Sequence, residues 1–137
     1  QAAPILAKKG FDHKAIAGIL GNSYGESVWD PKSMEPGTDN GGLFGFTTSP
    51  VSMADLRNFA SKKGKSWKNV GVQVRFMLTH GGPPGLELRH ELNALDSIPA
   101  TTAYFMNNWE RPNAAYAHLG KRIHGGFKAS EIMKSGR

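Results

Sequence analysis

Two chemically different candidates share the segment GNSYGESVWDP at residues 21–31. Its first five residues fit G-x-S-x-G, the pattern of a serine nucleophile on a sharp turn between a strand and a helix. Glu26 follows directly and carries a carboxyl group of the kind that donates a proton in general acid catalysis. The preceding apolar residues Ile16 and Ile19 recur at helical spacing, not strand spacing. This spacing favours Glu26 over Ser23, whose hydroxyl we expect to bond to a carbonyl one turn earlier.

Glu26 lies near the C-terminal end of a helix that we predict from Phe11 to Tyr24, with Asp12 as its N-cap. It stands seven residues after Ile19 and therefore points toward the same, packed side of the helix. Partial burial and the negative end of the helix dipole both disfavour an ionised carboxylate, which suits a general acid. Position alone fits a solvated residue at a helix end equally well, so both interpretations stay open at this step.

The composition limits the possible function classes. The chain has 137 residues, 39% of them hydrophobic, which predicts one compact domain over residues 1–137, either a mature protein or an excised domain. It has no cysteine, which excludes disulfides and a cysteine nucleophile. No apolar run is long enough to span a membrane. The net charge of +6 favours encounter with polyanions such as nucleic acid, anionic lipid or teichoic acid.

Metal and cofactor signals are weak in this sequence. His90-Glu91 begins like the zinc motif H-E-x-x-H, but Ala94 stands where the second histidine is required. We therefore predict neither a metal site nor a cofactor. Lys62, Lys63 and Trp67 suggest a basic patch with an aromatic ring, for which a solvated loop is the simpler interpretation.

Breaker residues divide the chain into helices and one long loop. Residues 30–50 are rich in proline and glycine, which predicts a functional loop with a short hairpin around Gly41 and Gly42. Helical periodicity returns in the segments Ser52–Ser61, Asn69–His80, Leu86–Leu95, Pro99–Trp109, Asn113–Ile123 and Lys128–Lys134. The predicted fold is mainly α.

Several segments together resemble the lysozyme-like superfamily of peptidoglycan-cleaving enzymes. They are Glu26-Ser27, Trp29-Asp30-Pro31, Asp39, the Gly42–Phe46 turn (GLFGF) and the WERP element at residues 109–112. The likeness spans most of the chain and points to phage-tail and goose-type lysozymes and to soluble lytic transglycosylases. It implies an α+β lysozyme-like domain in which the glycine- and proline-rich loop, or a short hairpin, forms one side of a substrate cleft.

The resemblance also assigns roles to residues. Glu26 takes the place of the family's acid. Asp39 follows after twelve intervening residues, the spacing at which goose-type enzymes hold the attacking water, and Gly45 stands at the expected interval beyond it. The chain departs from the family at residues 47–50, TTSP, where Met-Gln or Gln-Trp is common and a second aspartate is missing.

These roles predict a muramidase that cleaves the β-1,4 bond between N-acetylmuramic acid and N-acetylglucosamine. An inverting hydrolase has its carboxyl groups about 6.5–9.5 Å apart. Lytic transglycosylases need no water, so Asp39 favours hydrolysis. A non-catalytic wall-binding module is a third alternative. The expected partners are peptidoglycan strands and anionic wall polymers, and no specific nucleic acid is expected. We expect a monomer that acts outside the bacterium, either secreted or attached to a virion.

The candidate substrate-binding residues are Gly45, Phe46, Thr47 and Tyr116. Glycine backbone lets a sugar chain come close, and the Phe46 and Tyr116 rings suit sugar faces, although both also suit the core. Trp109 fits the core better. Glu110 fits either a second acid in the cleft or an ion pair with its neighbour Arg111.

Overall fold

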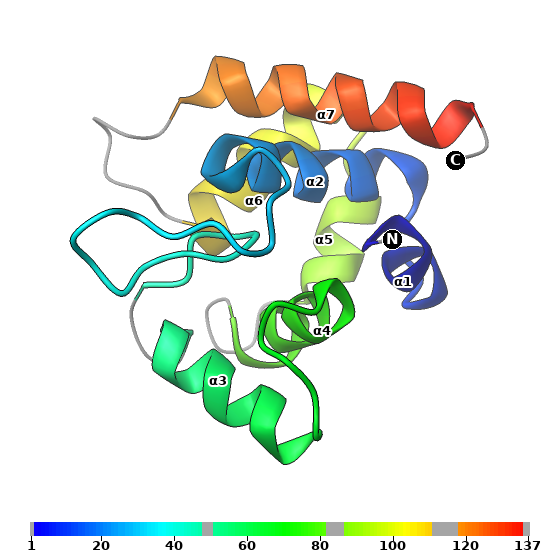
Figure 1. Ribbon diagram of the computed structural model, residues 1–137. Helices are drawn as coiled ribbons and strands as arrows, with labels where there is room; N and C mark the ends of the chain where they lie inside the picture. The colour runs from blue at the N-terminus through cyan, green and yellow to red at the C-terminus, as the bar shows by residue number, and fades with distance from the viewer. Residues whose placement is uncertain (1, 48–50, 82–86, 111–117, 136–137) are drawn as a thin grey trace.

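The computed structural model describes residues 2–47, 51–81, 87–110 and 118–135, and these are mainly helical. Figure 1 shows the helices in one compact arrangement, with the loop after α2 running down one side of the molecule. No strand longer than an isolated bridge occurs in the described ranges. The elements are α1 (Ala2–Lys8), α2 (His13–Ser27), α3 (Met53–Lys62), α4 (Val70–His80), α5 (Leu88–Asn93), α6 (Ile98–Phe105), the π-helical turn η1 (Met106–Glu110) and α7 (Leu119–Lys134). The mainly α prediction is confirmed.

Helix α2 is the central element, and it begins and ends where its sequence dictates. The Asp12 carboxylate caps its first turn by accepting a hydrogen bond from the Ala15 N–H at 2.9 Å. At the other end Val28 adopts a left-handed conformation with φ 51°, and its N–H bonds to the Tyr24 carbonyl. This left-handed residue turns the chain out of the helix directly after Ser27 and into the long loop.

Helix α7 lies alongside α2, as Figure 1 shows, and glycines make this close packing possible. A methyl group on Gly21 would collide with the backbone carbonyl of Arg122, and one on Gly25 would come within 2.6 Å of the Arg122 Cγ. These are the two glycines of the G-x-S-x-G pattern. The pattern therefore records a helix–helix contact, not a nucleophile turn, and it brings Arg122 to the end of α2 that carries Glu26.

The other predicted helices agree with the structure in most places. Ser52 caps α3 in a reciprocal capping box with Asp55, and the Asn69 side chain caps α4. Helix α5 lies within its predicted segment, and α6 begins at Ile98, one residue before its predicted segment.

Two parts of the helix prediction are wrong. Helix α1 was not predicted, because it is short and contains Pro4 within its first turn. The two predicted C-terminal segments form the single helix α7 as far as residues 119–134, while residues 113–117 lie outside the described part. Gly125 and Gly126 do not break this helix. They pack against Tyr24 and against Ile98 and Ala17, respectively.

An aromatic core joins the long loop to the end of α6 and to η1. Trp109 stacks on Phe105 with 5.3 Å between ring centroids, and Phe44 and Phe46 pack edge-on against Trp109. Trp109 is 8% exposed, which confirms the prediction that it belongs to the core. The loop reaches this core as a tight turn, closed by paired hydrogen bonds between the backbones of Gly41 and Phe46. The predicted hairpin is present in this reduced form.

Candidate active site

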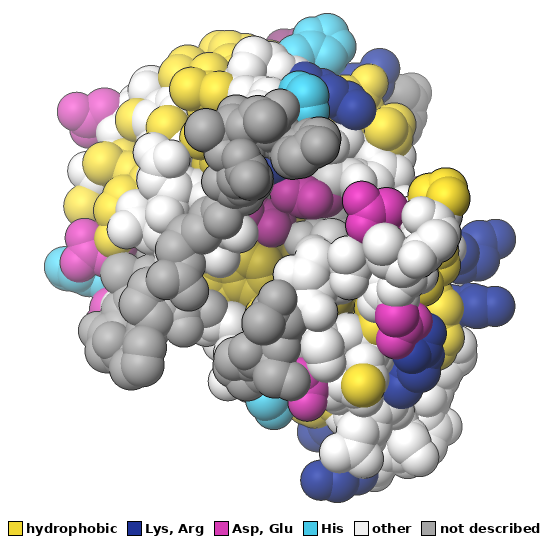
Figure 2. All heavy atoms as spheres, turned by 90° about the vertical axis from the view of Figure 1, so that its left-hand side faces the viewer, with side chains coloured by type: hydrophobic (Ala, Val, Ile, Leu, Met, Phe, Trp, Pro, Cys, Tyr) yellow, Lys and Arg dark blue, Asp and Glu magenta, His cyan; other side chains and the backbone are white. Residues whose placement is uncertain are grey.

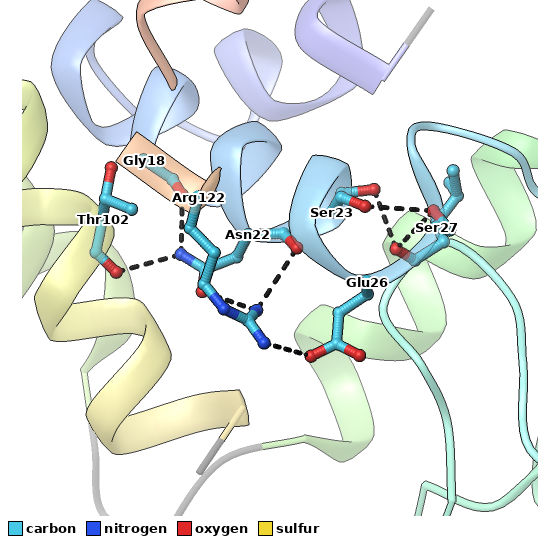
Figure 3. A network of polar contacts seen from close by, with 8 residues as sticks. Gly18, Asn22, Ser23, Glu26, Ser27, Thr102 and Arg122 are labelled. Atoms are coloured by element: carbon cyan, nitrogen blue, oxygen red, sulfur yellow. Dashed lines mark hydrogen bonds and ion pairs between the residues drawn. The ribbon is translucent and has the colours of Figure 1, made fainter. Parts of the chain in front are cut away.

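Glu26 projects from the last turn of α2 and is held by a buried arginine. Its Oε2 accepts a hydrogen bond of 2.7 Å from Nη2 of Arg122 on α7. The Glu26 side chain is 23% exposed, whereas that of Arg122 is 2% exposed. Figure 3 shows the two side chains facing each other below α2. The acid predicted from the sequence is therefore partly buried, ion-paired and still open to solvent on one side.

Arg122 is fixed by a network that starts within α2. Its Nη1 donates to the Oδ1 of Asn22 at 3.1 Å and to the Asn22 carbonyl at 3.3 Å. The Asn22 amide nitrogen in turn donates to the carbonyls of Gly18 and Thr102, each at 2.9 Å. Because both terminal nitrogens of the guanidinium are hydrogen-bonded, the group has little freedom to turn away from Glu26. Arg122 was not predicted as a site residue, because no local sequence pattern separates it from a surface cation.

The Gly42–Phe46 turn lies against the other oxygen of Glu26. Gly45 has φ +63°, and a Cβ at this position would collide with Glu26 Oε1 and lie 3.1 Å from its Cδ. Position 45 therefore requires glycine for two reasons: its backbone is left-handed, and a side chain would collide with the carboxylate of Glu26. Gly45 therefore lies directly beside the Glu26 carboxyl, and its role in substrate binding stays a prediction.

Both serines next to Glu26 anchor this turn. The Ser23 hydroxyl donates to the Leu43 carbonyl at 2.8 Å, and the Ser27 hydroxyl contacts the same carbonyl at 3.0 Å. Ser27, not Ser23, also donates to a carbonyl one turn earlier, at 3.0 Å, so the bond expected for Ser23 was assigned to the wrong serine. Neither hydroxyl has the geometry of an exposed nucleophile, because Ser23 and Ser27 are both buried.

A buried glutamine holds the turn from its other side. Gln73 of α4 is completely buried, and its Oε1 accepts a hydrogen bond of 2.7 Å from the Leu43 N–H. Its amide nitrogen donates to the carbonyls of Pro31 and Trp67. The Leu43 backbone is thus hydrogen-bonded to α2 through its carbonyl and to α4 through its N–H, and these bonds fix the turn beside Glu26.

Glu110, at the end of η1, is a second acid near Glu26. Its Oε2 is buried and has no hydrogen-bond partner among the described residues, and the same holds for the Trp109 indole nitrogen. The pKa of Glu110 is raised well above its ordinary value, first by burial and then by the negative charge of Glu26, against a smaller lowering by Arg122. The alternative pairing with Arg111 falls on a residue outside the described part.

Asp39 lies in the loop and is bound by Arg57 of α3. Arg57 Nη1 and Nη2 donate to the two carboxylate oxygens at 2.9 Å and 2.8 Å, and the Asp39 side chain is 61% exposed. The hydrogen bonds from Arg57 lower the pKa of Asp39, with some opposition from desolvation and further help from the Arg57 charge. Asp39 is thus a carboxylate with both oxygens engaged.

Three other residues, Phe46, Thr47 and Tyr116, were predicted to bind substrate, and they differ in burial and in whether the structure describes them. The Phe46 ring is 1% exposed and belongs to the aromatic core, so the interpretation of this ring as a surface for sugars is corrected. Thr47 is exposed at the end of the turn, while Tyr116 falls outside the described residues. Figure 2 shows a hollow between the upper and lower parts of the face where the loop runs, with acidic side chains in its middle.

A cavity of about 370 Å³ is lined in part by Ser23 and Leu43, which anchor the glycine turn to α2. Its walls are mostly apolar and come from α1, α2, α4, α7 and the long loop, and they include neither Glu26 nor Asp39. A polar glycan would find few hydrogen-bond partners in this cavity.

Helical architecture, a helix-end acid and a glycine turn against that acid are together the features of a lysozyme-like domain. The chain belongs to the phage tail lysozyme family, whose model matches residues 1–133. A search of curated proteins found no match. The family indicates a lysozyme-like, peptidoglycan-degrading function and a substrate in the bacterial cell wall.

Two features, a membrane-spanning helix and a metal-binding cluster, were sought in the described ranges and are absent from them. No helix there combines the length and the apolar character needed to cross a bilayer. The same residues contain no group of three or more acidic, histidine or cysteine side chains arranged to hold a metal ion.

Proposed function

We propose that the protein is a muramidase that cleaves the β-1,4 bond between N-acetylmuramic acid and N-acetylglucosamine, with Glu26 as the general acid. The observation that carries this proposal is the position of Glu26. One carboxylate oxygen is fixed by Arg122, while the other lies against the glycine turn at Gly45. A glycan lying along this turn would bring its bridging oxygen to the partly exposed Glu26 carboxyl.

In the proposed reaction Glu26 gives a proton to the bridging oxygen as the bond to the sugar carbon breaks. Positive charge then develops on the ring, and a water molecule completes hydrolysis from the opposite face. Asp39 is the proposed residue that orients this water. Its lowered pKa keeps it ionised, as a water-orienting carboxylate requires, but also makes it a weak base. We therefore assign Asp39 to holding the water more than to removing its proton.

A lytic transglycosylase is the second candidate, and the pairing of Asp39 with Arg57 favours it. Both Asp39 oxygens already accept hydrogen bonds from the guanidinium, which leaves fewer acceptor sites for a water. In a transglycosylase the C6 hydroxyl of the muramic acid attacks its own anomeric carbon and forms a 1,6-anhydro ring. Glu26 would donate the proton in either reaction.

The mass of the released fragments separates these candidates. Purified sacculi digested with the protein should yield fragments with reducing ends if it is a muramidase, and fragments lighter by one water if it is a transglycosylase. Glu131→Gln, an exposed change on α7, is the matched control for Glu26→Gln. Binding to sacculi without released fragments would instead support a non-catalytic wall-binding module.

The setting of this activity is part of the same proposal. We propose a single domain over residues 1–137 that acts as a monomer on the wall from outside, either attached to a virion or secreted. Exposed cations on and after α3, including Lys62, Lys63 and Lys65, suit contact with anionic wall polymers. Retention on sacculi that weakens with added salt would support this contact.

A further inference from the structure

A shallow pocket beside α3 combines two cationic side chains with an aromatic ring. Its volume is about 470 Å³, and Arg57, Lys65 and Trp67 line it together with small residues. We call it the Trp67 pocket. Gly64 also borders it, and a Cβ on this glycine would have nothing within 4 Å, so the wall leaves room for a further group. The pocket therefore offers positive charge around an open space.

The Trp67 ring holds the cations of this pocket in place. The guanidinium of Arg57 lies over the ring at 5.8 Å from its centroid, and the ammonium group of Lys68 lies over it at 5.9 Å. The ring also packs against the hydrophobic core, and the Trp67 carbonyl accepts a hydrogen bond from the buried Gln73. Three cations, with Lys65 as the third, are thus gathered at a fixed aromatic side chain.

The positive charge of the Trp67 pocket is mostly unbalanced. Of its three cations, only Arg57 forms an ion pair within the described part of the chain, and its partner is Asp39. Lys65 and Lys68 have no acidic partner there. Such a group attracts an anion, and a guanidinium can bind a phosphate through two parallel hydrogen bonds, as it binds the Asp39 carboxylate.

The chemistry of the pocket favours the phosphodiester of a polyol phosphate polymer over nucleic acid. Single-stranded nucleic acid binds through its charge and through bases that stack on open aromatic faces. The Trp67 ring is packed on the core and also carries two cations, which leaves it little open face. A polyol phosphate chain has no bases and needs only the charges. Teichoic acids are polymers of this kind and belong to the bacterial wall.

Arg57 can exchange Asp39 for such a phosphodiester at small cost. The Arg57 and Asp39 side chains are 43% and 61% exposed, and an ion pair this open to solvent contributes little to stability. A phosphodiester in the Trp67 pocket, held also by Lys65, competes for the guanidinium nitrogens that Asp39 occupies. Once these nitrogens turn to the phosphodiester, both Asp39 oxygens are free to accept hydrogen bonds from water.

We infer that the Trp67 pocket binds a phosphodiester of an anionic wall polymer, and that this binding draws Arg57 away from Asp39. The binding site stands on the pocket alone, whereas its effect on the reaction rests on the proposed function, in which Asp39 orients the attacking water. The ion pair between Arg57 and Asp39 then restrains hydrolysis until the protein meets an anionic wall.

Binding of soluble poly(glycerol phosphate) at low salt tests the site. Lys65→Gln removes one charge from the pocket and should raise the Kd about two- to fivefold. Lys134→Gln is the matched control, because it removes the same charge at the C-terminal end of α7, far from α3 in Figure 1, and should leave the Kd nearly unchanged. Equal losses in the two variants would show that affinity follows overall charge, and would overturn the site. Tighter binding of single-stranded DNA, at equal phosphate concentration, would refute the choice of a wall polymer.

Release of Asp39 is measured by carbon NMR as the pKa of its carboxyl group. In the free protein the hydrogen bonds from Arg57 lower this pKa. Saturation with poly(glycerol phosphate) should raise the pKa of Asp39 toward its ordinary value. Arg57→Gln should show the raised pKa even without the polymer. A pKa that stays lowered in the polymer-bound wild type would overturn the release.

Activity then tests the restraint on hydrolysis. With glycan strands stripped of wall polymers as substrate, poly(glycerol phosphate) should raise kcat of the wild type about two- to fivefold, and Arg57→Gln should have the raised kcat without it. Unchanged kcat in both cases would refute the restraint. If Glu26→Gln keeps its activity, the proposed function fails, while the Kd values and the pKa of Asp39 still decide the pocket and the release. If Glu26→Gln is inactive and neither readout responds, only this inference is refuted.

Discussion

Replacing Gly45 with alanine should separate activity from stability, because the new Cβ meets the proposed acid and little else. Gly45 has φ +63°, a conformation that costs a non-glycine residue about 1–2 kcal/mol. Its Cβ would collide with Glu26 Oε1, the far end of a flexible side chain that can move aside. Relief of this collision displaces the carboxyl group by about 1 Å, and a misplacement of that size can cost about 10²-fold in rate.

Gly64 provides the matched control. It has φ +66°, and a Cβ there would have nothing within 4 Å. Gly64→Ala therefore carries the same backbone cost without touching the site. We expect both variants to lose about 1–2 kcal/mol and to melt several degrees below the wild type, measured by circular dichroism.

Clearing of a sacculus suspension then compares the two variants at equal concentrations of folded protein. Gly64→Ala should clear at nearly the wild-type rate, and Gly45→Ala about 10²-fold more slowly. Equal rates for the two variants would show that the Glu26 carboxyl does not need the position that Gly45 leaves for it, and the reasoning would be refuted.

Other changes test the parts that support this site. Asp39→Asn should lower the rate of sacculus digestion by about 10²–10⁴-fold in a hydrolase that uses this carboxylate, whereas a transglycosylase would be little affected. Arg57→Gln removes the group that lowers the pKa of Asp39, so the acid limb of a hydrolase's pH–rate profile should move to higher pH; an unmoved limb would argue against Asp39. Gln73→Leu leaves the Leu43 N–H and the carbonyls of Pro31 and Trp67 without their partner, which should cost about 3 kcal/mol in denaturant unfolding, and a change below about 0.5 kcal/mol would show that these hydrogen bonds are dispensable.

The sequence predicted those elements whose signals are local. Ile16 and Ile19 at helical spacing, with Asp12 as cap, were sufficient for α2, and Ser52 and Asn69 marked the starts of α3 and α4. Helix α7 was divided in two in the prediction because a pair of glycines is normally a helix breaker. In the folded chain these glycines are stabilised by tertiary packing against Tyr24 and α6, which no local rule contains.

In the candidate site, too, residues with a local sequence signal were predicted, whereas a contact between residues far apart in the sequence was not. Glu26 was predicted from its place on the helix and from a family resemblance, and the neighbouring glycine turn was predicted with it. Arg122 is 96 residues away and looked like any surface cation, although its guanidinium bonds to Glu26 at 2.7 Å. Phe46 was given a surface role because an aromatic ring beside a glycine turn fits either a sugar or the core, and only its burial decides between them.

The most direct test of the central claim is the amount of glycan released from purified sacculi by Glu26→Gln. Because the amide keeps the shape of the carboxyl but cannot give up a proton to the bridging oxygen, release should fall by about 10²–10⁴-fold while the variant remains folded and bound to sacculi. The Glu131→Gln control should match the wild type. Release by Glu26→Gln within about twofold of the wild type would contradict the assignment of Glu26 as the general acid.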